Sequence, residues 1–315
     1  MFFHSKEREL SKVIVTGGAG FIGSNLVDKL ISDGHEVICL DNESSEVNAQ
    51  FYWNSKAINV NVDIRNLKLI IDYFTGVDYV FHLAGQSRIQ PSIINPLETL
   101  EINIMGTANV LEASRLKKIK KVIYSTTSSY YGLKNEVPNV ETQSEDCLNP
   151  YSLSKVTGDK LCKIYSELYG LQTIVLRYFC VYGNREPLKG EFAPVIGLFL
   201  RQYKEGKPLT VVGDGMQIRD FTHIEDVIRA NMLVMNANLV KSGEVYNVGS
   251  GSSLPILEIA QLISKNIAFI PPRVGEAKAS MANTEKIRDH FGWKSEMDLK
   301  TYISQKVSQI HKSNE

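Results

Sequence analysis

The stretch VIVTGGAGFIGSNLV, residues Val13–Val27, carries the strongest structural signal in the sequence. It runs from a short β-branched strand through three glycines into an amphipathic helix. Small residues at such a turn let a pyrophosphate approach the helix N-terminus, where free N–H groups and the helix dipole favour an anion. The spacing is GxxGxxG rather than GxGxxG, and a tight turn without a ligand is the alternative interpretation. We predict that a dinucleotide contacts five residues of the turn: Gly17, Gly20, Phe21, Ile22 and Gly23.

Two further strand ends support this interpretation. Asp41 ends the expected strand Glu36–Asp41. A carboxylate there can accept hydrogen bonds from both ribose hydroxyls and would repel a 2′-phosphate, and no arginine follows it immediately, so NAD is favoured over NADP. Asp63 and Ile64 close the next expected strand, where they would face the adenine edge, although Asp63 as a simple strand cap fits the spacing equally well.

Strands alternate with helices through the first 180 residues, which predicts a doubly wound, Rossmann-like parallel α/β sheet. After Gly183, glycine and proline cluster and the strands Leu209–Val212 and Glu244–Val248 look isolated. We therefore expect an NAD-binding domain over residues 1–180 and a smaller α/β substrate lobe over 181–315, interleaved with the first, with a ligand cleft between them. The other expected elements are the strands Lys12–Thr16, Ile58–Asp63, Tyr79–Ala84, Lys121–Ser125 and Gln172–Tyr178 and the helices Pro96–Leu116 and Pro150–Leu168.

Composition excludes several classes of function. Lys+Arg 35 against Asp+Glu 35 gives a formal net charge of +0, so the overall field favours no nucleic acid. No apolar run approaches the roughly 18 residues of a membrane span, and the start MFFHSKERELSK lacks a signal-peptide core. The four cysteines are scattered without metal-ligand or disulfide spacing. We expect a cytoplasmic protein with a small-molecule substrate and no bound metal.

A second set of residues suggests proton-transfer chemistry. In YSLSK, Tyr151 and Lys155 stand four apart at the start of an expected helix, and therefore on one face. A phenol is a poor base at neutral pH, but an adjacent ammonium and a cationic nicotinamide both favour the phenolate. Thr127 lies in YSTTSSYYG, at the carboxyl end of a strand, where a doubly wound sheet binds its ligand. Taken alone, a surface Tyr–Lys pair and an edge-strand Ser/Thr run would be the simpler interpretations.

Taken in order, TGGAGFIG, LDN, DIR, HLAGQ, the Ser/Thr-rich segment ending in YYG, YSLSK and RYFCVYG resemble the extended short-chain dehydrogenase/reductase family, and within it the NAD-dependent sugar-nucleotide epimerases and dehydratases. The resemblance runs from about Lys12 to about Trp293. It implies that Tyr151 is the acid/base, that Thr127 assists it, and that Lys155 holds the nicotinamide ribose and lowers the phenol pKa. It also adds to the cofactor site Asn42, Leu83, Ala84 and Gly85.

The family's dehydratases and decarboxylases carry an acidic residue in the two positions after the catalytic Ser/Thr. Here these positions are Ser128 and Ser129. The resemblance therefore implies reversible oxidation at a single carbon, which is a 4-epimerisation through a transient 4-keto sugar.

The second lobe resembles the family's sugar-nucleotide site. Arg219 and Arg273 match its diphosphate-binding arginines, and Glu276 its ribose-binding acid. Cys180 stands where many members have an asparagine, which puts that phosphate contact in doubt. Ser280 occupies a position where a large aromatic residue restricts some epimerases to unsubstituted hexoses. Two other residues, Arg88 and Ser128, are placed over the sugar.

The implied substrates are UDP-N-acetylglucosamine/UDP-N-acetylgalactosamine, UDP-glucose/UDP-galactose, or both. An alternative is a UDP-glucuronate 4-epimerase, with Arg88 or Arg185 binding the carboxylate. A more distant alternative is a non-catalytic NAD-binding regulator on the same fold. The resemblance also implies a homodimer formed by the helices Pro96–Leu116 and Pro150–Leu168, although Ile104, Val110, Leu111, Leu161 and Ile164 could equally face the sheet.

Overall fold

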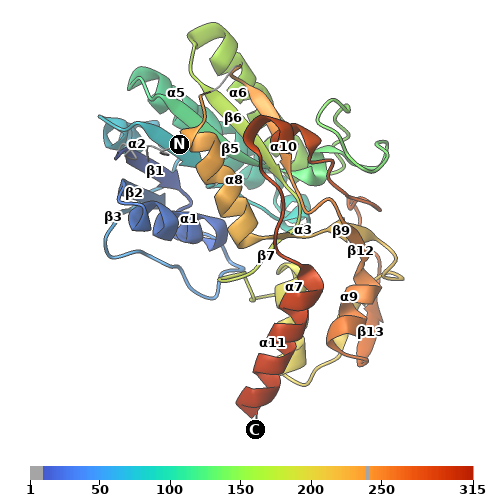
Figure 1. Cartoon of the computed structure of the whole chain (residues 1–315). Helices are drawn as coiled ribbons and strands as arrows, with labels where there is room; N and C mark the ends of the chain where they lie inside the picture. The colour runs from blue at the N-terminus through green and yellow to red at the C-terminus, as the bar shows by residue number, and fades with distance from the viewer. Residues whose placement is uncertain (1–9, 239–240, 315) are drawn as a thin grey trace, which may run out of the picture.

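Seven parallel strands form the centre of the molecule, in the order β11-β6-β5-β4-β1-β2-β3 (Figure 1). The structure is a computed structural model that describes residues 10–238 and 241–314. The strands are β1 (Lys12–Thr16), β2 (Glu36–Asp41), β3 (Ile58–Asn61), β4 (Tyr79–His82), β5 (Lys121–Thr127), β6 (Thr173–Tyr178) and β11 (Glu244–Val248). The predicted doubly wound parallel α/β fold is confirmed.

Helices cover both faces of this sheet. Side chains of β1 alternate between them: Val13 and Val15 pack in the core on the side of α1 (Phe21–Ser32) and α8 (Ile224–Asn236), and Ile14 packs in the core on the other side. Strands buried on both faces are expected when crossover helices cover a parallel sheet. The second face carries α2 (Leu67–Ile70), η1 (Ile71–Phe74), α5 (Gly106–Leu116) and α6 (Pro150–Tyr169).

The expected helix Pro96–Leu116 is present, but it is not uniform. It consists of α4 (Pro96–Leu100), a π-helical turn η2 (Glu101–Met105) and α5, preceded by the short α3 (Ile89–Ile94). Proline at the first position and the Asn95 cap start α4. A π turn inside a helix often accompanies a functional site, and this one carries a buried asparagine.

Two strands end earlier than the sequence predicts. β3 ends at Asn61 rather than Asp63, and β4 at His82 rather than Ala84. After His82 the backbone N–H of Leu83 still bonds the Thr16 carbonyl at 3.1 Å, but that of Ala84 bonds the Thr16 hydroxyl at 3.2 Å. A side chain thus replaces the backbone ladder, and Leu83 and Ala84 become loop residues.

The expectation that Glu244–Val248 is isolated was wrong. This strand, β11, pairs in parallel with β6 along its whole length and forms one edge of the main sheet. Strand pairing across such a long separation is set by tertiary contacts, which local sequence does not reveal. A boundary at residue 180 would therefore leave β11 outside the first domain, although this strand belongs to the main sheet.

The remaining elements gather below the main sheet in Figure 1, with their own core. They are β7 (Val181–Tyr182) paired with β10 (Thr222–His223), β9 (Ile218–Asp220) with β12 (Ser253–Pro255), β8 (Leu209–Val212) with β13 (Ile267–Ile270), and the helices α7 (Val195–Lys204), α9 (Ile256–Ile263) and α11 (Leu299–Asn314). The helix α10 (Glu285–Phe291) packs instead beside β11, and η3 (Ser128–Tyr130) follows β5. Within the described residues, no helix is long and apolar enough to cross a bilayer.

Candidate active site

The glycine-rich turn between β1 and α1 has the geometry of an anion cradle. Gly17 has φ +68°, and a Cβ atom there would lie 2.7 Å from the Ala84 nitrogen. A Cβ on Gly23 would lie 2.0 Å from the Gly17 carbonyl oxygen. Gly20 caps α1 without a side chain, so Phe21 and Ile22 begin a helix whose first N–H groups receive no side-chain cap. A pyrophosphate would satisfy such groups, so the turn fits a dinucleotide.

Asp41 is brought directly to this turn. Its carboxylate accepts hydrogen bonds from the Ala19 nitrogen at 3.0 Å and the Glu43 nitrogen at 2.8 Å. Burial raises the pKa of Asp41, and the N–H bonds from Glu43 and Ala19 oppose that rise. An acceptor at the end of β2, tied to the glycine turn, is placed as a ribose acceptor should be.

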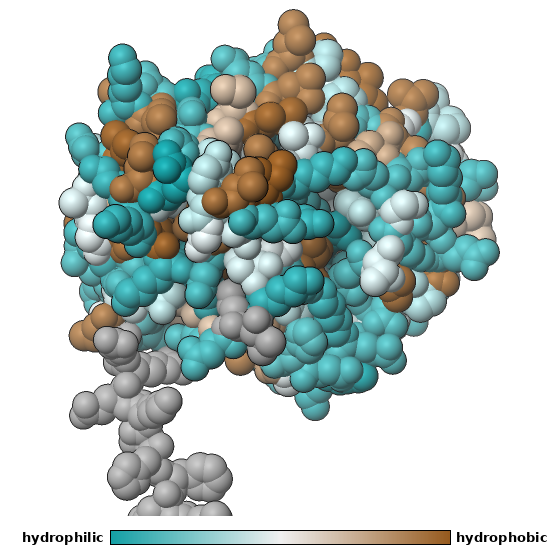
Figure 2. Space-filling model, turned by 90° about the horizontal axis from the view of Figure 1, so that it is seen from above, coloured by the Kyte–Doolittle hydropathy of each residue, from teal (hydrophilic) through white to brown (hydrophobic). Residues whose placement is uncertain are grey.

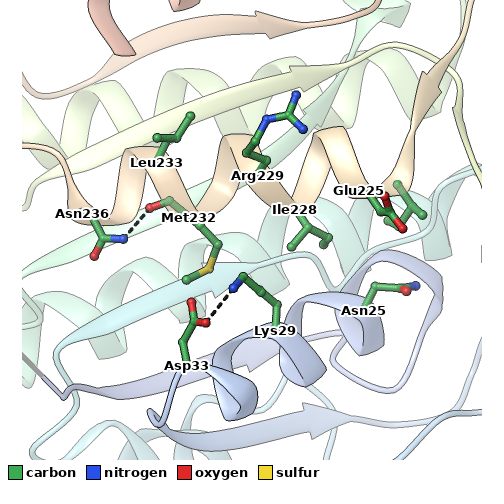
Figure 3. A pocket seen from close by; sticks show the side chains of 10 residues that line it. Asn25, Lys29, Asp33, Glu225, Ile228, Arg229, Met232, Leu233 and Asn236 are labelled. Carbon is green, nitrogen blue, oxygen red and sulfur yellow. Dashed lines mark hydrogen bonds and ion pairs between the residues drawn. The ribbon is translucent and has the colours of Figure 1, made fainter. Parts of the chain in front are cut away.

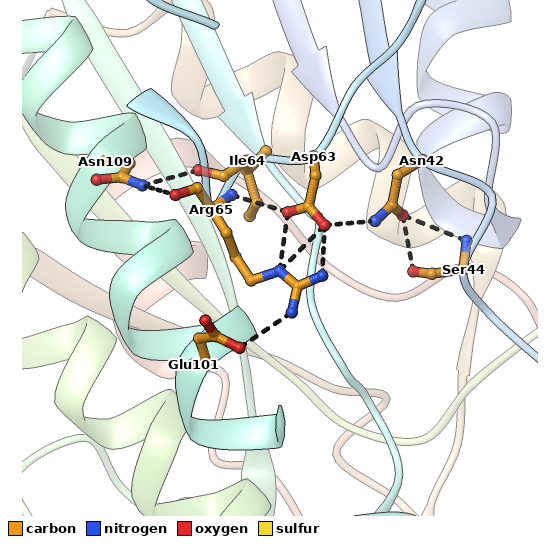
Figure 4. Close-up of polar contacts among 7 residues, drawn as sticks. All are labelled: Asn42, Ser44, Asp63, Ile64, Arg65, Glu101 and Asn109. Carbon is orange, nitrogen blue, oxygen red and sulfur yellow. Dashed lines mark hydrogen bonds and ion pairs between the residues drawn. The ribbon is translucent and has the colours of Figure 1, made fainter. Parts of the chain in front are cut away.

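Asp63, after β3, belongs to a polar cluster (Figure 4). The Arg65 guanidinium donates a hydrogen bond to the Asp63 carboxylate at 2.6 Å and forms an ion pair with Glu101 at 3.0 Å. The Asn42 amide also donates a hydrogen bond to Asp63, at 3.1 Å. The hydrogen bonds from Arg65 lower the pKa of Asp63. Asp63 and Arg65 line a hollow of about 540 Å³. Ile64 is buried, and its carbonyl accepts a hydrogen bond from the Asn109 amide at 3.0 Å. The contact of Asp63 with the adenine of the cofactor stays a prediction.

Tyr151 and Thr127 meet where α6 begins beside the end of β5. The Asn149 side chain caps α6 in a reciprocal arrangement with Ser152, and the Ser92 hydroxyl accepts a hydrogen bond from the Tyr151 nitrogen at 3.1 Å. Burial raises the pKa of the Tyr151 phenol, whereas a hydrogen bond with Thr127 and the charge of Arg88 lower it. The two groups predicted for proton transfer are therefore in direct contact.

Lys155 lies one turn further along the same helix face. It is 7% exposed, and its Nζ sits 4.2 Å from the centroid of the Tyr124 ring. Burial lowers the pKa of Lys155 to about 8, while the Asp159 carboxylate opposes the shift. The side chain is thus a buried cation near neutrality, aligned with Tyr151.

Two buried polar residues between the cofactor turn and α6 were missed by the sequence analysis. Asn103, on the π turn, accepts a hydrogen bond from the Gln86 nitrogen at 2.8 Å and donates to the Ser154 hydroxyl at 2.8 Å, which joins α6 to the loop after β4. Its oxygen lies 2.8 Å from where a Cβ of Gly85 would stand. An asparagine inside an otherwise apolar helical stretch was the signal available.

His82 is the second missed residue. Its ring nitrogens bond the hydroxyls of Thr16 at 2.7 Å and Thr107 at 2.9 Å, and its ring stacks on Tyr124. Burial lowers the pKa of His82 to about 3, so the imidazole is neutral. It connects β1, β4 and α5 beneath the cofactor turn.

On the substrate side, Arg88 faces Tyr151. Its positive charge lowers the pKa of Tyr151, of Cys180 and of Glu186. These three side chains therefore lie near Arg88. Its Nε is buried and makes no hydrogen bond to the described residues. Glu186, not identified from sequence, is buried, accepts a hydrogen bond from the Gly197 nitrogen at 3.1 Å, and has its pKa raised by burial to about 8.

The remaining predicted substrate residues lie on strand β9, on the loops near it and at the end of β5. Arg219 donates to the Ala277 carbonyl at 2.7 Å and is 3.9 Å from Glu276, so these two are brought together. Arg273 bonds the Glu191 carbonyl and lies over the Phe192 ring. Ser280 is buried with no hydrogen-bond partner for its hydroxyl among the described residues. Ser128 begins η3 directly after Thr127.

A separate hollow lies between α1 and α8 (Figure 3). It has a volume of about 470 Å³ and is lined by mainly apolar surface, with the Lys29–Asp33 ion pair on the α1 side. None of the predicted site residues lines it. The groups expected to carry the chemistry therefore gather elsewhere, at the carboxyl ends of the strands.

This fold combines a glycine turn suited to a dinucleotide with a Tyr–Lys pair near the strand ends. The combination is typical of enzymes that couple hydride transfer to a dinucleotide cofactor with proton transfer to a side chain. The sequence profile of the NAD dependent epimerase/dehydratase family matches residues 13–249. The chain belongs to this family, and NAD is its cofactor.

Known relatives cover nearly the full chain. A putative UDP-glucose 4-epimerase of Methanocaldococcus jannaschii is 37% identical, with 96% of this chain and 99% of that protein covered. The crystal structure of UDP-glucose 4-epimerase from Thermotoga maritima with UDP-glucose is similar with a TM-score of 0.89 and 32% identity, covering 96% of this chain and 100% of that one. A third relative is UDP-N-acetylglucosamine 4-epimerase from Methanobrevibacter ruminantium, whose structure contains UDP-N-acetylmuramic acid. Its TM-score is 0.87 and its sequence identity 29%, with 96% of this chain and 99% of that chain covered.

Proposed function

We propose that the protein is an NAD-dependent UDP-sugar 4-epimerase. The observation that carries the proposal is the contact between Tyr151 and Thr127 at the end of β5, where the next two residues are Ser128 and Ser129. Elimination or decarboxylation would need an additional acid or base close to the reacting carbons, and neither serine supplies one. Oxidation and re-reduction at C4 needs only a single proton carrier.

In this proposal the residues of the chain carry the proton and hold the sugar. Tyr151 accepts the proton of the C4 hydroxyl and later returns it, Thr127 hydrogen-bonds to the same oxygen, and the Lys155 ammonium stabilises the phenolate. When bound, NAD supplies the acceptor and donor of a hydride, so that C4 becomes a ketone and is reduced again on the opposite face. The sugar must turn over in the pocket between these two events.

The cofactor would be held by the glycine turn, by Asp41 and Asn42, by Asp63 and Ile64, and by Leu83, Ala84 and Gly85. Replacing Asp41 with Asn removes the ionised acceptor at the ribose. A hydrogen bond to a charged group is worth about 1.5–3 kcal/mol, so we expect the affinity for NAD to fall about tenfold to a hundredfold. Calorimetric titration of the cofactor-free enzyme measures this, and an unchanged NAD affinity would remove Asp41 from the site.

The substrate diphosphate would be bound by Arg219 and Arg273, since a guanidinium fork suits phosphate oxygens, and the ribose by Glu276. In the structure Arg219 is occupied by the carbonyls of Ile218 and Ala277, so binding would require it to exchange these partners for phosphate. Cys180 and Ser280 would line the sugar side. The small Ser280 leaves room for an N-acetyl group, which favours UDP-N-acetylhexosamines alongside UDP-hexoses.

The experiment that tests the function is a screen of UDP-sugars by proton NMR, following the couplings of the C4 proton as the hydroxyl changes between equatorial and axial. We expect interconversion of UDP-N-acetylglucosamine with UDP-N-acetylgalactosamine, of UDP-glucose with UDP-galactose, or of both, without added NAD. Absence of product on both pairs, from protein shown to contain NAD, would contradict the proposal.

The unpaired Nε of Arg88 favours a second candidate, a UDP-glucuronate 4-epimerase, because a cation in the sugar pocket could bind the C6 carboxylate. Arg185 is a weaker candidate for that contact, since it forms an ion pair with Asp28 at 2.6 Å. If uronate is the substrate, Arg88→Ala should abolish the preference for uronate over hexose. An Arg88→Ala enzyme that keeps this preference would count against the second candidate.

We also propose a homodimer through α4–α5 and α6. Val110 and Leu111 face the sheet, but other apolar side chains of these helices are exposed: Leu97, Met105, Leu153, Ile164 and Leu168. Seen from above, the surface shows hydrophobic patches separated by hydrophilic side chains (Figure 2). Clustered exposed apolar residues are typical of an interaction surface. Light scattering should give twice the monomer mass, and a monomer at micromolar concentration would contradict the proposal.

A further inference from the structure

Asp159 stands one turn beyond Lys155 on the helix that carries Tyr151. Residues 151, 155 and 159 are spaced four apart and therefore lie along one face of α6, with about 5–6 Å between neighbouring Cβ atoms. Lys155 and Asp159 are each 7% exposed. In the described part of the chain, Lys155 forms no ion pair with a carboxylate.

The carboxylate of Asp159 is only half used by its own ion pair. Its Oδ2 accepts hydrogen bonds from Arg177 Nη2 at 3.1 Å and Nε at 3.2 Å, whereas its buried Oδ1 takes no part in the ion pair. The Thr126 hydroxyl is a further, uncharged hydrogen-bond partner of this carboxylate. Burial raises the pKa of Asp159, and Arg177 and Lys155 oppose that rise. Arg177 itself is fixed by the Tyr131 hydroxyl at 3.3 Å and lies over the Tyr130 ring.

The other titratable groups that face Lys155 are neutral at neutral pH. His82, from β4, has its pKa lowered by burial to about 3. Burial raises the pKa of Tyr124 on β5 well above its ordinary value and raises that of Cys162 on α6 as well. Asp159 is therefore the anion that faces the Lys155 ammonium, and it opposes the effect of burial on the Lys155 pKa.

We propose that Asp159 is a positioning residue for the reaction: its carboxylate, fixed by Arg177, serves as the counter-charge that keeps the proton on Lys155 while Tyr151 gives up its own. The inference rests on the proposed roles of Tyr151 and Lys155. It assigns to the buried Asp159–Arg177 pair a function beyond stability, since such a pair alone is weak evidence for stabilisation.

The consequence for the pH profile follows from the coupling of the two groups. The Tyr–Lys pair loses its first proton from either residue, and only the form with phenolate and ammonium is productive. The two singly deprotonated forms carry equal numbers of protons, so their ratio does not depend on pH. Without the Asp159 charge, Lys155 loses its proton more easily, and more of the pair is trapped as phenol and neutral amine.

Asp159→Asn should therefore change kcat/KM for the UDP-sugar in a specific way between roughly pH 6 and pH 10. The midpoint of the acid limb moves to lower pH, because the Asp159 charge raises the pKa of both Lys155 and Tyr151. Asp159 is one helical turn from Lys155 and two from Tyr151, so the Lys155 pKa should fall further, and the plateau falls about tenfold for each unit of that difference. Well below the midpoint the productive form depends only on the proton affinity of Tyr151, which the Asp159 charge also raises. There the variant should be at least as active as the wild type. A packing defect would instead lower the rate by one factor at every pH.

Three further variants make the test decisive. Asp159→Glu keeps the charge and should restore most of the plateau. Glu167→Gln removes an exposed carboxylate of α6, paired with Lys163 at 3.8 Å, and should leave the profile unchanged. If Asp159→Asn does not fold because Arg177 is left buried and unpaired, the double variant Asp159→Asn/Arg177→Met removes both charges and should show the same profile.

A profile parallel to that of the wild type, in the single or the double variant, would overturn the inference, and so would a plateau that Asp159→Glu fails to raise. The proposed function is tested separately, by wild-type turnover and by Tyr151→Phe. An active wild type, an inactive Tyr151→Phe and a parallel Asp159→Asn profile would reject the role of Asp159 alone.

Discussion

Tyr151→Phe should abolish epimerisation while leaving NAD bound. The substitution removes only the phenolic oxygen, which is the group in contact with Thr127. General acid–base catalysis contributes about 10²–10⁴-fold, so we expect a loss in kcat of at least that size. The position of α6 should not change, because its cap at Asn149 and the bond from the Tyr151 nitrogen to Ser92 do not involve the phenol.

The measurement is turnover of the UDP-sugar identified by NMR, together with the NAD content of the purified protein. Tyr165→Phe is the matched control, because Tyr165 lies on the same helix and its hydroxyl donates to Glu112 at 3.2 Å, outside the site. It should keep wild-type turnover. Turnover by Tyr151→Phe within a few-fold of the wild type would remove Tyr151 from its proposed role, and would reopen the interpretation as a non-catalytic NAD-binding protein.

The parts of the site that could be predicted from sequence are those encoded by local spacing. The glycine turn is such a case, since Gly17 and Gly23 meet each other within one strand–turn–helix unit. Tyr151 and Lys155 are another, because four residues of helix place them on one face whatever the rest of the chain does.

The parts that were missed depend on partners distant in the sequence. His82 is defined by Thr16 and Thr107, and Glu186 by Arg88 and the Gly197 nitrogen. A histidine at the end of a strand or a glutamate in a Gly/Pro-rich loop has no local pattern that distinguishes burial from exposure. The same reason explains β11, whose place in the sheet is fixed by pairing with β6. Asn103 is intermediate, since a polar residue within an apolar helical stretch could have been singled out.

Gly23→Ala is expected to damage the fold and the cofactor site together, although helix propensity predicts the opposite sign. Gly23 is in the first turn of α1, where replacing glycine by alanine should gain about 1 kcal/mol. The added Cβ would stand 2.0 Å from the Gly17 carbonyl oxygen and 2.8 Å from the Gly18 Cα, which are backbone atoms that cannot rotate away. Overpacking costs about 1–3 kcal/mol even where side chains can adjust, so here the clash should outweigh the gain in helix propensity.

Relief of this clash requires α1 to move away from the turn, which displaces the N–H groups that would bind the pyrophosphate. We therefore expect Gly23→Ala to lower the free energy of unfolding by about 2 kcal/mol or more and to reduce NAD affinity by at least about tenfold. Urea denaturation and calorimetric NAD titration measure the two effects. Ser32→Ala, an exposed change in the last turn of α1, should leave both near the wild type. If the Gly23→Ala protein is as stable as the wild type, the turn can open without a loss of folding free energy. The close contact between α1 and the turn would then not position the cofactor.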